Sequence, residues 1–433
     1  MREPEFLDKV VARDNGLDVH RLESEKDPEG SSIWLEREDL LLEFTRLVGA
    51  ARDGGATIAE CVSTANAIDF ADDGSWPREW TAIANLTSAR ADTALADGKI
   101  LAARSGWLRA MNYYQAAAFP FSSADQGYHS AIAAMRQCAT NYVRHAAPRG
   151  EIVQIAWPAG HPLQGYFLPP PHTTGRAPVV ICIAEPGERK EEFLYKAAAQ
   201  AFDRGMAMLA VDLFGAGPDA DFEQVVGRRD LEATVGCVMD YLVERDDIDE
   251  TRVAILGDGM KSSFVARGIA FDDRYAAAVC DGGLWDLHER EFLRDRIASQ
   301  EPGVMLRPTL SRAARNIKCP VLIPAGERGW LQPERVKELY AQLKADGRDV
   351  TLQIFTDGEA AATGHAGSPT SASAIIFDWI EARLGLPTAA RPREGRGMSE
   401  TGGHRAGLGL GATDPTVRLG RAASGCGPSS PRE

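Results

Sequence analysis

The spacing of hydrophobic positions changes near residue 150, and the change separates two kinds of predicted structure. Before that point apolar residues recur every three to four positions, which is the period of an amphipathic helix. The stretches with this pattern are 33–51, 76–85, 88–97, 99–118 and 128–146. Residues 1–148 are therefore predicted to form a helical region that serves as a cap or lid.

After this region, short and wholly apolar runs alternate with helical stretches. The runs are 178–184, 206–212, 252–257, 276–282, 320–326 and 350–356. They are preceded by two strands of a predicted hairpin, at 152–158 and 163–171. Apolar strands that alternate with helices are typical of a mostly parallel sheet covered on both faces. The predicted fold class is α/β, and this domain spans residues 149–387.

Residues 388–433 differ in composition from both regions. They contain ten glycines, seven arginines, four acidic residues and almost no large apolar side chains. Such a segment cannot bury enough apolar surface to offset the entropy lost on ordering. We predict that this segment is a disordered, solvent-exposed tail without a binding function. The alternative is that the tail binds an anionic partner.

Overall composition excludes several classes of protein and partner. Of 433 residues, 44% are apolar and 25% are charged, which is ordinary for a globular protein. The net charge is −14 and no basic stripe is present, so nucleic acid is not an expected partner. The seven cysteines form no C-x-x-C pair, the first residues lack the apolar core of a signal peptide, and no apolar run of about 18 residues occurs. We therefore predict a cytoplasmic protein without membrane contact.

Several sequence motifs resemble those of a known group of enzymes and occur in the same order along the chain. They are AMNYYQAAAFPF at 110–121, LQGYFLPP at 163–170, KEEF at 190–193, VDLFGAGPD at 211–219, the stretch 252–283, and DWI at 378–380. Residues 15–385 resemble the α/β-hydrolases that include 2,6-dihydroxypseudooxynicotine hydrolase, the FrsA-like proteins and the fungal pigment chain-shortening hydrolases. The resemblance implies an α/β-hydrolase fold with an N-terminal helical cap. It also implies cleavage of carbonyl compounds, including C–C bonds next to ketones.

The nucleophile position that the resemblance implies holds a glycine. The strand-to-helix turn of such a fold places its nucleophile between small residues. Here the turn is GDGMK at 257–261, so Gly259 stands at the nucleophile position without a side chain, and Met260 beside it is a candidate pocket residue. An acyl-enzyme at this residue is excluded. Lys261 is a candidate base or Schiff-base amine if it is desolvated, or else a solvated residue at a helix start.

The other two triad positions also depart from the pattern. The acid position, within GERGWLQP at 326–333, is Gly329, and Glu327 lies two residues before it. Alanine follows Glu359 where the resemblance implies a histidine, and His365 comes later in the same loop. Glu327 either orients a histidine or pairs at the surface. His365 is either a pocket residue or an exposed loop residue.

The loop expected to bind an oxyanion is altered as well. It runs AEPGERK at 184–190 and places Pro186 about where a backbone N–H would be donated. Because proline has no N–H, half of the oxyanion hole is missing unless Gly187 serves instead. Both residues are candidates to line the substrate site. Tyr113 and Tyr114 are candidates for its roof, with burial in the cap core as the alternative.

Titratable residues after the run 276–282 offer a replacement for the triad. His288 is a candidate general base, with Asp286 or Glu289 to orient it. Loops at the carboxyl ends of parallel strands face the ligand crevice of an open α/β sheet, which favours this role. The alternative is a solvated helix start.

Three functions remain open from the sequence. The first is an enzyme that binds a ketone, ester or polyketide-like molecule and uses non-covalent acid–base chemistry for cyclisation, elimination or C–C cleavage. The second is an inactive homologue that binds a ligand or a protein, and the third is a hydrolase with an unorthodox nucleophile. No cofactor and no metal site is predicted, because the histidines are dispersed and no dinucleotide fingerprint is present. The sequence is also compatible with a homodimer.

Overall fold

A computed structural model of the chain describes most of its first 386 residues. The described ranges are 37–122, 124–157, 162–172, 175–184, 190–212, 231–257, 262–280, 284, 313–326, 333–355 and 369–386. The chain divides into two units between Ala389 and Ala390, and every described residue belongs to the first.

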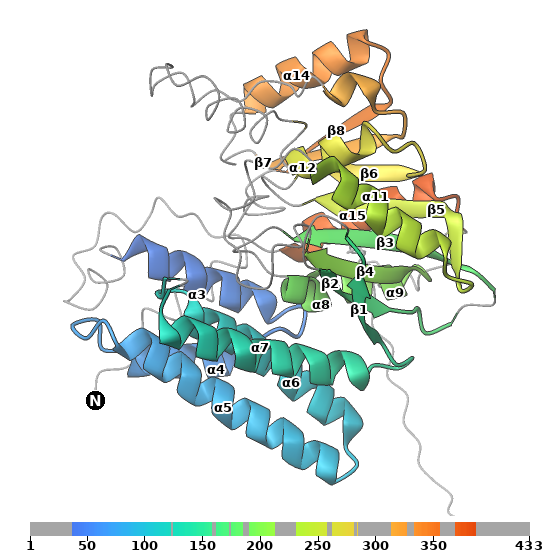
Figure 1. Ribbon diagram of the computed structural model, residues 1–433. Helices are drawn as coiled ribbons and strands as arrows, with labels where there is room; N and C mark the ends of the chain where they lie inside the picture. The colour runs from blue at the N-terminus through green and yellow to red at the C-terminus, as the bar shows by residue number, and fades with distance from the viewer. Residues whose placement is uncertain are drawn as a thin grey trace, which may run out of the picture. The chain divides into compact units, whose positions relative to one another are not determined.

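The described N-terminal residues form helices, as predicted (Figure 1). The helices are α3 (Glu38–Ala50), α4 (Ile58–Ala67), α5 (Ser75–Ala96), α6 (Ile100–Ala118) and α7 (Gln126–Arg144). α5 is one helix where two were expected, since neither glycine nor proline interrupts 78–96 and Ala84, Thr87 and Ala91 are all buried. α4 was not predicted, and its N-cap Thr57 accepts a hydrogen bond from the backbone N–H of Glu60.

The described strands form one eight-stranded sheet in the order β1-β2-β4-β3-β5-β6-β7-β8. Their bounds are β1 (Glu151–Ile155), β2 (Leu163–Leu168), β3 (Ala177–Ala184), β4 (Ala207–Asp212), β5 (Ile248–Gly257), β6 (Ala277–Cys280), β7 (Val321–Gly326) and β8 (Val350–Phe355). β2 pairs antiparallel with β1 and with β4, and the remaining neighbours are parallel. The predicted fold class, a mostly parallel sheet that begins with a hairpin, is confirmed.

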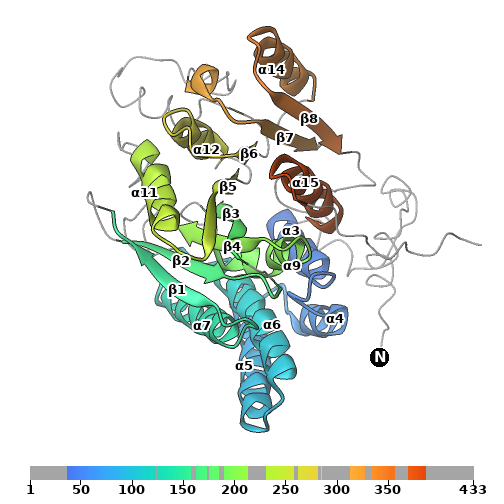
Figure 2. The same cartoon turned by 90° about the vertical axis from the view of Figure 1, so that its right-hand side faces the viewer.

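Helices cover both faces of this sheet. Those after β3 are η2 (Lys190–Glu192), α8 (Phe193–Lys196), α9 (Ala198–Phe202), α11 (Leu231–Val243), α12 (Ser262–Ile269), η5 (Ala313–Asn316), α14 (Pro333–Ala345) and α15 (Pro369–Arg383). Figure 2 shows α11 and α12 on one side of the strands and α9 and α15 on the other. Side chains alternate between the faces: on β3, Val180 and Cys182 pack with the N-terminal helices, whereas Val179 and Ile181 pack with α11 and α12. Burial on both faces explains why the strands are apolar throughout.

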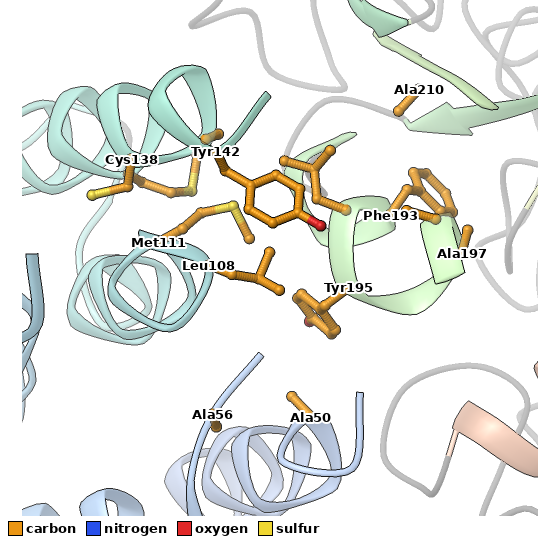
Figure 3. Close-up of a cluster of buried hydrophobic side chains, with 14 of the residues drawn as sticks. Ala50, Ala56, Leu108, Met111, Cys138, Tyr142, Phe193, Tyr195, Ala197 and Ala210 are labelled. Atoms are coloured by element: carbon orange, nitrogen blue, oxygen red, sulfur yellow. The ribbon is translucent and has the colours of Figure 1, made fainter. Parts of the chain in front are cut away.

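The helical region and the sheet share one hydrophobic core. Figure 3 shows Leu108 and Met111 of α6 and Tyr142 of α7 directed toward α8, which carries Phe193 and Tyr195. α8 follows β3, so the segment at the carboxyl end of this strand is packed against the N-terminal helices.

The parallel strands direct their carboxyl ends to one edge of the sheet. β4, β3 and β5 are neighbours there, and their last residues are Asp212, Ala184 and Gly257. β5 ends at Gly257 and α12 begins at Ser262, so the predicted nucleophile turn lies between a strand and a helix, as the fold requires.

Candidate functional site

Most of the residues predicted to carry chemistry lie outside the described residues. They are Pro186, Gly187, Gly259, Met260, Lys261, Asp286, His288, Glu327 and His365. In the sequence they follow the carboxyl ends of β3, β5, β6, β7 and β8, which are parallel strands of one sheet. These ends meet at the edge where ligands bind in open α/β sheets. The roles of the nine residues remain predictions.

Tyr113 and Tyr114 are described, and both lie within the helical region. Tyr113 is fully buried; its hydroxyl donates to Glu60 Oε2 at 2.7 Å and accepts from the backbone N–H of Thr57 at 3.0 Å. The Tyr114 hydroxyl donates to Asn85 at 2.6 Å. Both rings therefore occupy the core of this region, and a role in lining a substrate pocket stays a prediction.

Ser262 is the residue nearest to the glycine turn that could offer a replacement hydroxyl. It is the first residue of α12, and it is fully buried. A serine that attacks a substrate must reach the ligand, so its burial favours a structural role.

A network of buried and half-buried polar side chains joins the helical region to the segment after β3. We call it the interface network; its members are Glu43, Arg46, Asn112, Gln115, Glu192, Tyr195 and Lys196. Arg46 of α3 stands at its centre, with a two-point ion pair to Glu43 at 2.6 and 2.8 Å. The same guanidinium donates to Asn112 Oδ1 at 2.6 Å and to the Tyr195 hydroxyl at 2.9 Å. Arg46 thus links α3, α6 and α8.

Glu192 forms the second part of the interface network. Its carboxylate accepts from Gln115 Nε2 at 2.5 Å and pairs with Lys196. Burial alone would raise the pKa of Glu192, but the attraction of Lys196 and Arg46 outweighs it and lowers the pKa to about 2. Burial and the nearby Glu192 raise the pKa of the Tyr195 hydroxyl to about 12. At neutral pH the network therefore holds a charged carboxylate and a neutral phenol.

A second cluster, the edge cluster, lies at the carboxyl ends of β3 and β4. Its members are Tyr166, Lys190, Glu191 and Asp212. Lys190 pairs with Asp212 Oδ2, and its Nζ lies 3.4 Å from Glu191 Oε1 and 5.3 Å from the centre of the Tyr166 ring. The Tyr166 hydroxyl donates to Glu191 at 3.0 Å. These contacts join the segment after β3 to the last residue of β4.

Burial and charge act in opposite directions on Lys190. Burial alone would lower the pKa of this ammonium, but the attraction of Asp212 and Glu191 outweighs it and raises the pKa. At neutral pH Lys190 is therefore a protonated ammonium rather than a nucleophilic amine. Its carboxylate partner Asp212 is 37% exposed, whereas the lysine side chain is 3% exposed.

The residues of the edge cluster lie within the motifs LQGYFLPP, KEEF and VDLFGAGPD, but their residue types alone predicted no role for them. The signal available was a charged residue, Asp212, directly at the end of an apolar strand, and a lysine, Lys190, just after the loop that follows β3. Their proximity depends on the parallel pairing of β3 with β4.

The described residues contain no group of three or more histidine, cysteine, aspartate or glutamate side chains placed to hold a metal ion. None of the described helices has the length and apolar character needed to cross a membrane.

Comparison with known proteins identifies the family. Residues 64–294, more than half of the chain, match the family described as Esterase FrsA-like. The chain belongs to the FrsA-like esterase family. Among solved structures, that of 2,6-dihydroxy-pseudo-oxynicotine hydrolase aligns with this FrsA-like chain at a TM-score of 0.61 and 20% identity, covering 78% of this chain and 95% of the other. At this identity the comparison shows a shared α/β-hydrolase fold.

Curated relatives of this FrsA-like protein include fungal enzymes. Hydrolyase poxO of Penicillium oxalicum is 29% identical over 313 residues, which cover 70% of this chain and 68% of the relative. The 20-hydroxy-prefusarin hydrolase FUS2 of Gibberella moniliformis is 30% identical over 273 residues, which cover 59% of this chain and 63% of that relative. The first of these relatives is thus named a hydrolyase and the second a hydrolase.

Proposed function

We propose that this FrsA-like protein is an enzyme that acts on a ketone or ester of a polyketide-like small molecule by non-covalent acid–base chemistry. The observation that carries the proposal is the glycine at 259: in the sequence it lies between β5 and α12, where the family resemblance predicts the nucleophile. Without a side chain there, no acyl-enzyme forms at this residue.

The substrate class is supported by the relatives. One of them is named for a hydrolysis of 20-hydroxy-prefusarin, and it is 30% identical to this chain. We extend from that name only that the substrate is a small organic molecule; that it is a carbonyl compound is what the family resemblance implies. It would bind at the carboxyl edge of the sheet.

Within the proposal, His288 acts as the general base, and Asp286 orients its ring. His365 with Glu327 is the second acid–base pair, and Lys261 is a further candidate base. Because these groups only move protons, the reaction class is cyclisation, elimination or C–C cleavage. Pro186, Gly187 and Met260 line the substrate site.

Two other functions are compatible with Gly259. An inactive homologue would bind a ligand or protein and turn over nothing, and a hydrolase with an unorthodox nucleophile would cleave activated esters. The buried position of Ser262 argues against it as that nucleophile.

The experiment compares the wild type with Gly259→Ser, His288→Ala and His365→Ala on a panel of nitrophenyl esters, aryl ketones and 1,3-diketones. We expect the wild type to convert ketone members, with a loss of about 10²–10⁴-fold in His288→Ala. If any of these proteins gains ester hydrolysis, we expect it to be Gly259→Ser and not the wild type or the histidine variants. Absence of turnover by the wild type on the whole panel would favour the binding function, and rapid ester cleavage by the wild type would favour the unorthodox nucleophile.

A further inference from the structure

We propose that Asp212 is a catalytic acid–base residue of this protein and that the buried ammonium of Lys190 positions it. The inference rests on the proposed function and adds to it a residue that moves a proton at the carbon next to the substrate carbonyl. Three observations support the inference: the strand register around Asp212, the direction of the Asp212 side chain, and the difference in exposure between Asp212 and Lys190.

Strand register places Asp212 close to the predicted reaction centre. Asp212 pairs with Ala184 of β3, and Ile183 of β3 pairs with Gly257 of β5. Asp212 and Gly257 are thus two strands apart at the same edge of the sheet, a separation of about 10 Å between backbones. Gly257 is the last residue before the nucleophile turn. A side chain at Asp212 and a molecule of polyketide size at that turn are therefore within reach of each other.

The side chain of Asp212 is on the face of the sheet that the N-terminal helices cover. On β4, Met208 and Ala210 pack into the core shared with those helices, and alternate residues of a strand share a face. The side chain thus lies at the carboxyl edge and beneath the helical region, where a substrate held between cap and sheet would bind.

The two partners of the ion pair differ in what they can contact. Lys190 is 3% exposed, and it lies among Glu191, Tyr166 and Asp212, so it cannot contact a substrate directly. Asp212 is 37% exposed and bonds Lys190 through Oδ2. Oδ1 has no hydrogen-bond partner within the described part of the chain. Lys190 is therefore the positioning residue, and Asp212 offers a carboxylate oxygen to a ligand.

The proposed step is a reversible proton transfer. Oδ1 of Asp212 takes a proton from the carbon next to the carbonyl, an O–H bond forms on the carboxyl group, and the C–H electron pair moves into the enolate. When the proton returns to a carbon of the substrate or product, the carboxylate is restored. No oxidant, reductant or cofactor takes part, and the Lys190 ammonium keeps its proton throughout.

The test measures deuterium uptake from D₂O into aryl alkyl ketones, whose spontaneous exchange is slow, by mass spectrometry and proton NMR. We expect the wild type to catalyse exchange and Asp212→Asn to lose about 10²-fold or more. The matched control is Asp273→Asn, which removes a carboxylate that also pairs with a lysine, Lys318, but precedes the amino end of β6 at the opposite edge of the sheet. This variant should exchange within twofold of the wild type.

Two further variants separate catalysis from folding. Lys190→Arg should keep the exchange and its pH profile. Lys190→Met should shift the acid limb of the profile to higher pH, because the Asp212 carboxyl loses the stronger of the two cations that lower its pKa and keeps only Arg136. Asp212→Glu, which keeps the charge but moves the carboxylate, should fold and lose at least tenfold of the exchange. Undiminished exchange in Asp212→Asn or Asp212→Glu would overturn the inference and leave the proposed function standing. Absence of exchange and of any turnover by the wild type would overturn both.

Discussion

Arg46 and Tyr195 are 149 residues apart in the sequence, yet the Arg46 guanidinium donates a hydrogen bond to the Tyr195 hydroxyl at 2.9 Å. This bond connects α3 of the helical region to α8, which follows β3. It is accompanied by Asn112 and Glu43 on the same guanidinium. The helical region is therefore joined to the sheet by buried charge as well as by apolar packing, and we expect the two to unfold together.

Removing Arg46 should destabilise the protein strongly. Arg46→Met leaves the carboxylate of Glu43, which is 6% exposed, without its partner, and breaking a buried pair in this way costs about 3–5 kcal/mol. Urea unfolding followed by tryptophan fluorescence measures the loss. The control is Arg78→Met, which breaks an exposed pair with Asp72 and should leave the midpoint nearly unchanged. Equal midpoints for the two variants would contradict a central role for Arg46.

Gly55 is required by the close approach of its loop to Tyr195. A Cβ at this position would lie 2.8 Å from Tyr195 Cγ, so Gly55→Ala forces the ring or the loop to move. Overpacking of this kind costs about 1–3 kcal/mol, measurable as a fall in the thermal midpoint. Gly236→Ala, whose Cβ would have no atom nearer than 3.8 Å, should be neutral or slightly stabilising. If Gly55→Ala is as stable as this control, the contact is not tight in solution.

The hydroxyl of Tyr113 should contribute to stability through its two buried hydrogen bonds. Tyr113→Phe removes bonds to both Glu60 and the Thr57 N–H, and loss of partners for buried polar groups costs about 1–3 kcal/mol. Tyr114→Phe removes one bond, to Asn85, and should cost less. Thermal midpoints and the KM for a converted ketone distinguish the roles. A rise in KM with an unchanged midpoint would instead place Tyr113 in the substrate pocket.

The lowered pKa of Glu192 leads us to expect that the free energy of unfolding depends on pH. Its pKa in the folded protein is about 2, below the ordinary value of 4.5, so its carboxylate stabilises the fold fully above about pH 4.5. This contribution, up to about 3 kcal/mol, is lost as the pH falls from 4.5 toward 2. Glu192→Gln should therefore be less stable than the wild type at pH 6, and the difference should narrow with acidification.

Urea midpoints at pH 6, 4.5, 3.5 and 2.5 measure this difference. Asp97→Asn is the control, because Asp97 is half exposed in a surface pair with Lys99. A constant difference between wild type and Glu192→Gln across the series would show that the charge of Glu192 is not stabilised by Lys196 and Arg46.

The sequence predicted the fold well because the signals for it are local. Apolar runs such as 178–184 and 320–326 correspond to β3 and β7 within one residue, since strands buried on both faces must be apolar throughout. The division of α5 into two helices was wrong because alanine-rich helices have a weak hydrophobic period.

The contacts around the site could not be predicted in the same way. Lys190 and Asp212 meet because β3 and β4 are adjacent and parallel, and Arg46 meets Tyr195 because the N-terminal helices and α8 share one hydrophobic core. Neither pairing leaves a periodic pattern in the sequence. The assignment of Gly259 to the nucleophile position rests on the order of the motifs between the strand β5 and the helix α12, and it remains a prediction.

The central claim, catalysis without a covalent serine intermediate, is tested most directly by intact-protein mass spectrometry after incubation with a fluorophosphonate probe. An active serine hydrolase in the same reaction serves as the positive control for the probe. We predict that the wild type keeps its unmodified mass while it still converts a ketone of the panel. Stoichiometric addition of one probe group, mapped by peptide analysis to Ser262, Ser263 or another serine, would contradict the account.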